Sequence, residues 1–389
     1  MFGAYISEQI NLNKHLQPNS HTYSVANFLS LIFTMKKINF YAGPSILPRE
    51  VIEELAQGVL NFNESGLSVL EISHRSADFE AVMDNARELV KELLQLPNHY
   101  EVLFLGGGAS VQFCQVPYNL LPVNGTAAYV NTGVWATGAI HEARFFGNTE
   151  VVASSEDGNF SYIPQIPMVG KEYAYLHITT NNTIFGTQYH QLPQCECPLI
   201  ADMSSDIFSK KTDVSKFDLF YAGAQKNLGP AGTTLVVVNP EILGKTNRTI
   251  PTMLNYQTHI KKGSMFNTPP VFAVYGCYLT LQWIKKRGIE QIEADNNAKA
   301  ALLYTEIDRN SLFTGTAKPQ HRSIMNATFT ITRPELEKTF LQFAHEAGCV
   351  GIKGHRLVGG FRASMYNAMN MEGVKTLTEV MKTFEDKYA

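Results

Sequence analysis

The sequence of 389 residues has few cysteines, and their spacing does not indicate a metal site or a disulfide framework. The five cysteines are an odd number and lack zinc-site spacing. Cys195 and Cys197, separated by one glutamate, are too close for the usual metal knuckle. We therefore expect reduced thiols, no metal and a cytoplasmic location.

Long hydrophobic runs and blocks of charge are also missing. No apolar run reaches the roughly 18 residues that a membrane-spanning helix requires, so we expect no membrane partner. Charged residues make up only 17% of the chain, the formal net charge is -3, and the sequence has no basic block. These features argue against nucleic acid or an anionic membrane as the main partner, so any attraction for anions must be local.

Residues 1–34 differ from the rest of the chain, because they are polar and have no clear amphipathic period. The apolar stretch 25–33 lacks the basic region and the small-residue cleavage site of a signal peptide. Met35 opens a stretch that reads like a natural start. We predict that residues 1–34 are a mis-called upstream extension or a disordered tail rather than a targeting segment.

The length predicts two domains, because a single hydrophobic core stops growing well below this size. Strands and helices alternate in the first part of the chain, a pattern typical of right-handed crossovers and a largely parallel sheet. The predicted strands are 101–105, 127–131, 151–154, 173–180, 199–203, 219–222 and 234–238. From Ile289 onward, helices around a strand at 325–332 indicate a smaller α+β domain. The predicted boundaries are 35–49 for a segment joining the small domain, 50–288 for the large cofactor-binding domain and 289–389 for the small domain.

Lys226 lies in a polar turn just past the predicted strand 219–222, with glycines on both sides. At that place its side chain can reach a pocket formed by other strand ends. Burial disfavours the ammonium form, so a desolvated lysine there becomes a nucleophilic amine that can condense with an aldehyde. A surface lysine in a loop is the alternative, and most loop lysines are of that kind.

Asp202 ends the preceding apolar strand, 24 residues before Lys226. Pyridoxal phosphate enzymes need a lysine to hold the cofactor aldehyde and a carboxylate to keep the pyridine nitrogen protonated. Two successive strands that end in Asp and Lys would supply both groups. A helix cap or turn residue is the alternative role for Asp202, but the two signals together favour the cofactor.

The strand 101–105 runs directly into Gly106-Gly107-Gly108-Ala109-Ser110 and an apolar helix. This order predicts a phosphate cradle, because free amide groups and the positive end of the helix dipole point at the anion. The stretch is neither a Walker loop nor a GxGxxG motif, so a small phosphate-bearing cofactor fits better than a nucleotide. Trp135 and Thr183 follow two other strands, and Trp135 could stack on a flat ring or belong to the core.

Two basic stretches are candidates for anion binding. Residues 353–362 place Lys353, His355, Arg356 and Arg362 within ten positions, in a glycine-rich loop and strand. In a mildly acidic protein such a cluster indicates an anionic substrate, although a solvated turn is the alternative. The adjacent pair His74-Arg75 follows a short piece, 68–73, that we predict to be extended, and it could bind an anion or be a solvated turn.

These stretches resemble the phosphoserine aminotransferase family, which are pyridoxal phosphate enzymes of the class V aminotransferases. The resemblance covers about residue 35 to the end. It rests on NFYAGPSILP, EISHR, FLGGGASVQF, NTGVWATGAI, ADMSS, YAGAQKNLGPAG, GSMFNTPP and GHRLVGGFRASMYNA. It implies the α/β fold of type I, with a large, mainly parallel seven-stranded sheet domain and a smaller α+β C-terminal domain.

The resemblance also implies roles for single residues. Lys226 would be the catalytic Schiff-base lysine and Asp202 the partner of the pyridine nitrogen. Other cofactor-binding residues would be Ala109, Ser110, Trp135, Thr183 and Gln225, with Asn267 and Thr268 contributed by the second subunit of a homodimer. Substrate-binding residues would be His74, Arg75, His355, Arg356 and Arg362.

The implied reaction moves an amino group from L-glutamate to 3-phosphohydroxypyruvate, giving O-phospho-L-serine and 2-oxoglutarate. This step belongs to serine biosynthesis, and in many bacteria the family also acts in pyridoxine biosynthesis. Another aminotransferase, a cysteine desulfurase of the same fold and a non-catalytic phosphate-ligand binding protein are the alternatives. The chain departs from many members of the family at Ala42, where they carry serine, and at Ala109-Ser110, where some carry Gly-Arg.

Overall fold

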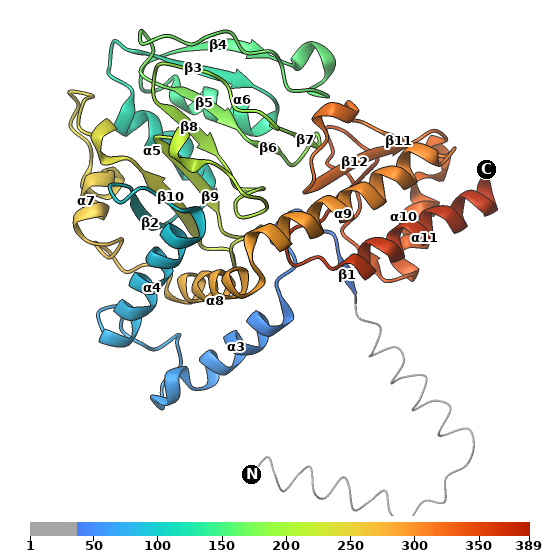
Figure 1. Cartoon of the computed structure of the whole chain (residues 1–389), viewed down its shortest axis with the longest axis horizontal. Coiled ribbons are helices and arrows are strands. Elements are labelled where there is room, and N and C mark those ends of the chain that lie inside the picture. Colours follow the sequence, from blue (N-terminus) through green and yellow to red (C-terminus); the bar gives the residue numbers. More distant parts are fainter. Residues whose placement is uncertain (1–36) are drawn as a thin grey trace, which may run out of the picture. The chain divides into compact units, whose positions relative to one another are not determined.

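The computed structural model describes residues 37–389, so the prediction for residues 1–34 lies outside the described residues. Residues 39–389 pack as one compact unit (Figure 1). The division into domains at 50–288 and 289–389 therefore stays a prediction. In the described part of the chain no helix is long and apolar enough to cross a membrane.

The elements are as follows. The strands are β1 (Ile38–Asn39), β2 (Glu101–Gly106), β3 (Thr126–Asn131), β4 (Asn148–Ser154), β5 (Leu176–Thr179), β6 (Asn181–Asn182), β7 (Thr187–Gln188), β8 (Leu199–Asp202), β9 (Leu219–Gly223), β10 (Thr233–Val238), β11 (Phe313–Gly315), β12 (Asn326–Ile331), β13 (Cys349–Val350) and β14 (Phe361–Ser364). The α-helices are α3 (Arg49–Leu60), α4 (Ala77–Leu94), α5 (Ala109–Leu120), α6 (Val134–Ala143), α7 (Tyr256–Lys261), α8 (Val271–Arg287), α9 (Ile289–Arg309), α10 (Glu337–Glu346) and α11 (Met371–Tyr388).

A seven-stranded sheet with the order β2-β10-β9-β8-β5-β3-β4 organises the larger part of the unit. The pairs β3-β4, β3-β5, β5-β8 and β8-β9 are parallel, whereas β10 runs antiparallel to both β9 and β2. The predicted seven-stranded, mainly parallel sheet is confirmed. The carboxyl ends of its parallel strands meet along one edge, where ligands bind in open α/β sheets.

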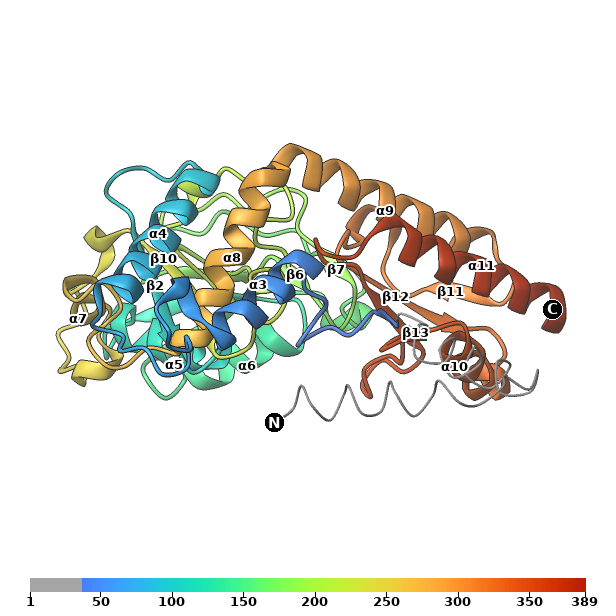
Figure 2. The same cartoon turned by 90° about the horizontal axis from the view of Figure 1, so that it is seen from below.

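The two faces of this sheet are buried by different helices. Alternate strand residues such as Phe104, Ala201 and Phe220 pack in one cluster with α4 and α8. Their neighbours Leu103, Ile200 and Leu219 pack in a second cluster with α5 and α6. Because side chains alternate along a strand, both faces are covered and the strands are apolar throughout. Figure 2 shows α4 and α8 on the side of the sheet opposite α5 and α6.

The C-terminal part is built on a three-stranded antiparallel sheet with the order β11-β12-β14. Its core contains the rings of Phe313, Phe340 and Phe361, with centroids 4.7 to 6.0 Å apart. The helix α9 extends from α8 towards β11 and lies along α11 in both views (Figures 1 and 2). One helix thus connects the region of the large sheet to the region of the small one.

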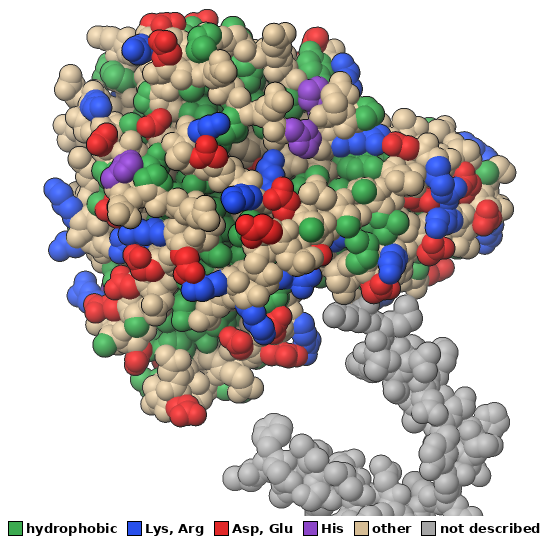
Figure 3. Space-filling view, in the orientation of Figure 1, with side chains coloured by type: hydrophobic (Ala, Val, Ile, Leu, Met, Phe, Trp, Pro, Cys, Tyr) green, Lys and Arg blue, Asp and Glu red, His purple; other side chains and the backbone are tan. Residues whose placement is uncertain are grey.

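Acidic and basic side chains are interspersed over the face of the molecule drawn in Figure 3. Most of the ion pairs join exposed side chains, such as Arg49 with Glu53 and Lys375 with Glu372. Exposed pairs contribute little to stability. The buried cations described below are therefore the ones that carry information about function.

Candidate active site

Lys226 lies three residues past the end of β9, in a turn that closes against the neighbouring strands. Its Nζ atom donates a hydrogen bond to Oγ1 of Thr183 at 3.1 Å and lies 5.8 Å from the centre of the Trp135 ring. Thr183 is buried, and Trp135, at the start of α6, is 37% exposed. Three residues predicted for the site from separate strand ends therefore lie together.

The electrostatic surroundings of Lys226 favour a free amine. Burial lowers the pKa of Lys226, and the positive charge of Arg362 lowers it further, against the opposing charges of Asp202 and Asp206. A lysine with a lowered pKa has more of its nucleophilic form at neutral pH. Lys226 can therefore condense with a carbonyl or accept a proton.

Asp202 ends β8, which pairs in parallel with β9, and its partner across the two strands is Tyr221. The carboxylate is buried, and Oδ1 accepts a hydrogen bond from the amide of Ser204 at 2.9 Å. Burial raises the pKa of Asp202, while the charge of Lys226 and the contacts with Ser204 hold it down. The two strands bring Asp202 and Lys226 into electrostatic contact, as the sequence predicted.

The glycine stretch after β2 forms an uncapped helix start. Gly107 and Gly108 have φ values of 101° and 71°, a conformation that side chains disfavour. A Cβ atom on Gly107 would lie 2.6 Å from Cγ2 of Val111, so the backbone comes too close there for any larger residue. No side chain caps α5, and Ala109 and Ser110 keep solvent access. Their amides are available to an anion such as a phosphate.

Arg362 lies in β14, with a guanidinium that is partly buried. Its Nε atom is buried and has no hydrogen-bond partner among residues 37–389. Burial lowers the pKa of Arg362, and the pKa of His355 is lowered by burial and then by the charges of Arg362 and Arg356. The guanidinium groups of Arg362 and Arg356, with His355 beside them, therefore form a positive cluster near Lys226. A desolvated guanidinium without an anion is unfavourable, so the cluster is suited to an anionic ligand.

Two predicted pairs are not joined to this cluster. His74 and Arg75 precede α4. The segment 68–73 before them forms a turn, in which the amide of Glu71 donates a hydrogen bond to the carbonyl of Ser68 at 2.9 Å. The prediction that this segment is extended is therefore wrong. Asn267 and Thr268 are exposed in the loop before α8. Within the described chain no hydrogen bond or ion pair connects either pair with Lys226.

The segment 40–45 contributes contacts that sequence reasoning missed. Oγ of Ser45 donates to the backbone carbonyl of Lys226 at 2.5 Å, and the amide of Ser45 donates to the carbonyl of Gln225 at 3.0 Å. The hydroxyl of Tyr366 donates to the carbonyl of Ala42 at 2.8 Å. This last contact uses the backbone, so the alanine at position 42 does not remove it. The serine directly after Gly43-Pro44 was the only local signal.

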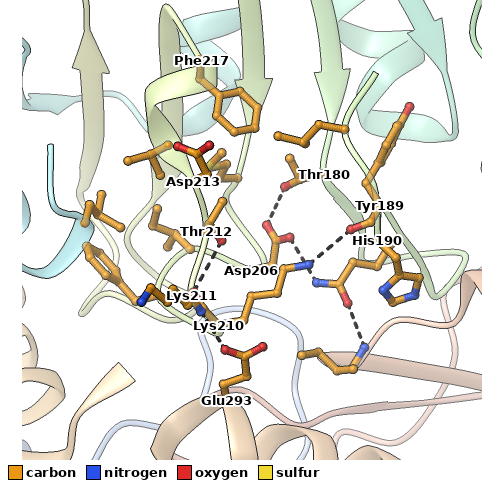
Figure 4. A pocket seen from close by; sticks show the side chains of 18 of the residues that line it. Thr180, Tyr189, His190, Asp206, Lys210, Lys211, Thr212, Asp213, Phe217 and Glu293 are labelled. Carbon is orange, nitrogen blue, oxygen red and sulfur yellow. Dashed lines mark hydrogen bonds between the residues drawn. The ribbon is translucent and has the colours of Figure 1, made fainter. Parts of the chain in front are cut away.

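A separate cavity of about 400 Å³ lies beyond Asp206, in the loop that follows β8 (Figure 4). Its wall includes Asp206, which accepts hydrogen bonds from Thr180 and Gln188, and Lys210, which donates to the carbonyl of Tyr189 at 3.3 Å. Lys226 and Arg362 do not line it. This cavity therefore does not coincide with the cluster of reactive side chains around Lys226. The chemistry of the side chains, rather than this cavity, indicates the active site.

Comparisons with known proteins agree with this geometry. The family model described as Aminotransferase class-V matches residues 38–377. A phosphoserine aminotransferase of Flavobacterium johnsoniae is 59% identical over 355 residues, which are 91% of this chain and 100% of that protein.

Two solved structures are also similar. The phosphoserine aminotransferase from Bacillus circulans subsp. alkalophilus is 43% identical, with a TM-score of 0.89 over 92% of this chain and 100% of that one. A pyridoxal-phosphate-bound phosphoserine aminotransferase from Trichomonas vaginalis is 33% identical, with a TM-score of 0.85 over 89% of this chain and 100% of that one.

Proposed function

The chain belongs to the class-V aminotransferase family, and from this premise we propose that it transfers the amino group of L-glutamate to 3-phosphohydroxypyruvate. The products are O-phospho-L-serine and 2-oxoglutarate. The observation that carries the proposal is the proximity of a desolvated amine, Lys226, to the partly buried guanidinium of Arg362, whose Nε has no hydrogen-bond partner among the described residues. An amino acid or keto acid would place its carboxylate on Arg362 while it reacts at Lys226.

Pyridoxal phosphate is the cofactor, and the residues present fit it. The uncapped start of α5 offers amides of Ala109 and Ser110 to the cofactor phosphate. Trp135 would cover the ring, and Thr183 and Gln225 would line it, whereas the buried carboxylate of Asp202 would pair with the pyridine nitrogen. When bound, the cofactor supplies an electron sink for the bond that breaks at the substrate's α-carbon.

Lys226 moves the proton in this reaction. Its amine would hold the aldehyde of the cofactor and, once free, would take the proton from the substrate's α-carbon. The lowered pKa of Lys226 favours the free form of this amine. The hydroxyl of Thr183, which already accepts a hydrogen bond from Nζ, orients it.

The basic cluster selects the substrate. Arg362 pairs with the substrate's carboxylate, and His355 and Arg356, together with His74 and Arg75, receive the phosphate or the second carboxylate of glutamate. A phosphate group offers three acceptor oxygens and close to two charges at neutral pH, so it gains more from a guanidinium than one carboxylate does. Exposure of Arg356 and Arg75 leaves both free to meet it.

A homodimer would complete the site. Asn267 and Thr268 are exposed and not bonded to the Lys226 cluster, which supports contribution of this pair from a second copy of the chain. Arg75 is likewise exposed and not bonded to the Lys226 cluster, which supports such a contribution from the pair His74-Arg75. Mixing inactive Lys226→Ala protein with an inactive Thr268→Ala variant should restore activity in hybrid dimers. No recovery after proven exchange of subunits would contradict a shared site.

A half-reaction screen of amino donors tests the function. The holoenzyme is mixed with single amino acids, and the visible absorption of the bound cofactor is followed until it changes to the pyridoxamine form. L-glutamate and O-phospho-L-serine should convert it rapidly, whereas L-serine and L-alanine should not. Lys226→Ala is the matched control that binds donors without converting the cofactor. Equal rates with L-alanine would assign another aminotransferase activity.

A further inference from the structure

Lys299 of α9 is a buried lysine that the mechanism above does not use. The side chain is 1% exposed. Its Nζ atom donates to three backbone carbonyls, those of Met365 at 3.2 Å, Tyr366 at 3.0 Å and Met369 at 2.9 Å. An ammonium group has three N–H donors, so these three acceptors saturate it.

The three carbonyls belong to the segment that directly continues β14. Arg362 lies in β14, four residues before Tyr366, and the hydroxyl of Tyr366 donates to the carbonyl of Ala42 beside Lys226. The amide of Met365 also donates to the carbonyl of Met325 at 2.7 Å. Lys299 therefore fixes the backbone directly after β14, the strand that contains Arg362.

A chain of asparagines links the same helix to the residue after Lys226. Asn296, one turn before Lys299, donates through Nδ2 to Oδ1 of Asn367 and to the carbonyl of Ser209, both at 2.9 Å. The amide of Asn367 donates to Oδ1 of Asn227 at 3.0 Å. All three asparagine side chains are buried. Helix α9 thus holds both the Arg362 segment and the turn that carries Lys226.

Lys299 forms no ion pair with any of residues 37–389. Asp295, whose charge acts on Lys299, is bonded to Arg287 and to Gln291. Burial lowers the pKa of Lys299 to about 7, because desolvation disfavours the ammonium, and the three carbonyls offset part of that penalty. Three hydrogen bonds to backbone carbonyls, with no ion pair among the described residues, point to a role in fixing the backbone.

We propose that Lys299 is a positioning residue of the reaction, which sets the guanidinium of Arg362 at a fixed distance from the amine of Lys226 through the 365–369 segment and the Asn296–Asn367–Asn227 chain. The proposal rests on the proposed function in one respect, namely that Arg362 receives the substrate's carboxylate. Lys299 touches neither substrate nor cofactor. Lys299 affects how firmly Arg362 holds the substrate's carboxylate. That carboxylate fixes the α-carbon within reach of the Lys226 amine.

The test compares Lys299→Met with the wild-type holoenzyme in binding glutarate, a dicarboxylate that has no amino group and cannot react. Methionine keeps the length and the apolar contacts but removes the three hydrogen bonds. Calorimetric titration should show a dissociation constant about 3- to 30-fold larger, the range found for residues that couple at a distance. Lys375→Met, which removes an exposed lysine of α11, should leave the constant unchanged.

A double-mutant cycle separates positioning from a general loss of order. In the Arg362→Gln background, Lys299→Met should weaken glutarate binding by less than twofold further, because the group that it positions is gone. A merely structural role would lower the melting temperature and leave the dissociation constant of the folded protein unchanged. That result, or full additivity of the two substitutions, would overturn the proposal.

Hydrogen exchange gives a readout that does not depend on any substrate. Amides of residues 361–369 should exchange faster in Lys299→Met, while those of β8 and β9 should not. Should Lys299→Met fail to fold, Asn296→Ala takes its place, with the same two measurements and the same expected directions. If the wild-type protein does not bind glutarate, the donor assignment fails, and exchange at 361–369 alone then decides the role of Lys299.

Discussion

Lys226 is partly buried and Lys299 is fully buried, and burial lowers the pKa of both. The two lysines differ in how many hydrogen bonds their amines make. Among residues 37–389, Nζ of Lys226 has a single hydrogen-bond partner, the hydroxyl of Thr183, whereas Nζ of Lys299 has three backbone carbonyls. The saturated amine has no capacity left for a ligand, and the unsaturated one does. For this pair, the number of partners rather than the pKa separates the reactive lysine from the positioning one.

Two arginines repeat the contrast. The guanidinium of Arg322 forms two hydrogen bonds of 2.6 Å with the carboxylate of Asp308 and stacks over the ring of Tyr304. The guanidinium of Arg362 has a buried Nε without a partner in the part of the chain that the structure describes. A group held at such a disadvantage is typical of a binding site, where activity is kept at the expense of stability.

The largest expected effect is on turnover in Lys226→Ala. The rate should fall by about 10⁴-fold, the upper end of what a general acid–base group contributes. The free energy of unfolding should stay the same or rise, since one desolvated amine is removed. Lys299→Met should instead lower the free energy of unfolding by about 2 to 4 kcal/mol, because buried carbonyls lose their donors. Turnover assays and urea unfolding of the two variants decide whether the contrast holds.

The next effect is on carboxylate binding by Arg362→Gln. The dissociation constant of glutarate should rise by about tenfold to more than a hundredfold, because a charged hydrogen bond contributes roughly 1.5 to 3 kcal/mol. Arg322→Gln is the matched control, and it should lower the melting temperature without changing glutarate binding. If both substitutions weaken glutarate binding equally, the number of hydrogen bonds that an arginine makes does not distinguish a binding residue from a structural one.

Substrate selectivity should change in Arg356→Ala. The ratio of kcat/KM for 3-phosphohydroxypyruvate to that for hydroxypyruvate should fall by about tenfold or more, because loss of the guanidinium affects a phosphate more than an uncharged hydroxyl. Lys353→Ala, eight residues before β14 in the same glycine-rich stretch, serves as the control for a general loss of charge. An unchanged ratio would exclude Arg356 as the phosphate reader.

The smallest effect concerns His177, a buried group that adds a third case to the comparison. Its Nε2 contacts the hydroxyl of Tyr221 at 3.0 Å, Nδ1 has no partner among the described residues, and burial lowers its pKa to about 3. The neutral ring stabilises the fold above pH 6.5, and this stability is lost as the pH falls towards 3. The slope approaches about 1.4 kcal/mol per pH unit. Urea unfolding between pH 7 and 5 should show a shallower slope in His177→Asn.

Much of the fold followed from the sequence, because the apolar strands and their order are local signals. All seven strands of the large sheet lie where apolar runs predicted them. The helix α8 was not predicted. Its buried residues occur on most of its circumference, so it has no amphipathic period to find.

The site was predictable where residues follow strand ends and not where they act through tertiary contacts. Asp202 and Lys226 follow adjacent parallel strands, and such positions meet by topology. Lys299 lies in a polar helix, and nothing in its neighbours distinguishes it from a solvated lysine. Its role depends on carbonyls some 70 residues further on, which only the folded chain brings to it.

The contacts of residues 40–45 have a consequence for the order of events during synthesis. Phe40 bonds to the backbone of Val350 and Ser364, and Ser45 bonds to that of Lys226. This segment leaves the ribosome among the first of the described residues, and its partners are made as many as 320 residues later, on the order of tens of seconds at bacterial or eukaryotic rates. The large sheet can form as soon as β10 has emerged, but the turn of Lys226 gains its last support only when β14 is complete. A nascent chain therefore carries its reactive amine before it can use it.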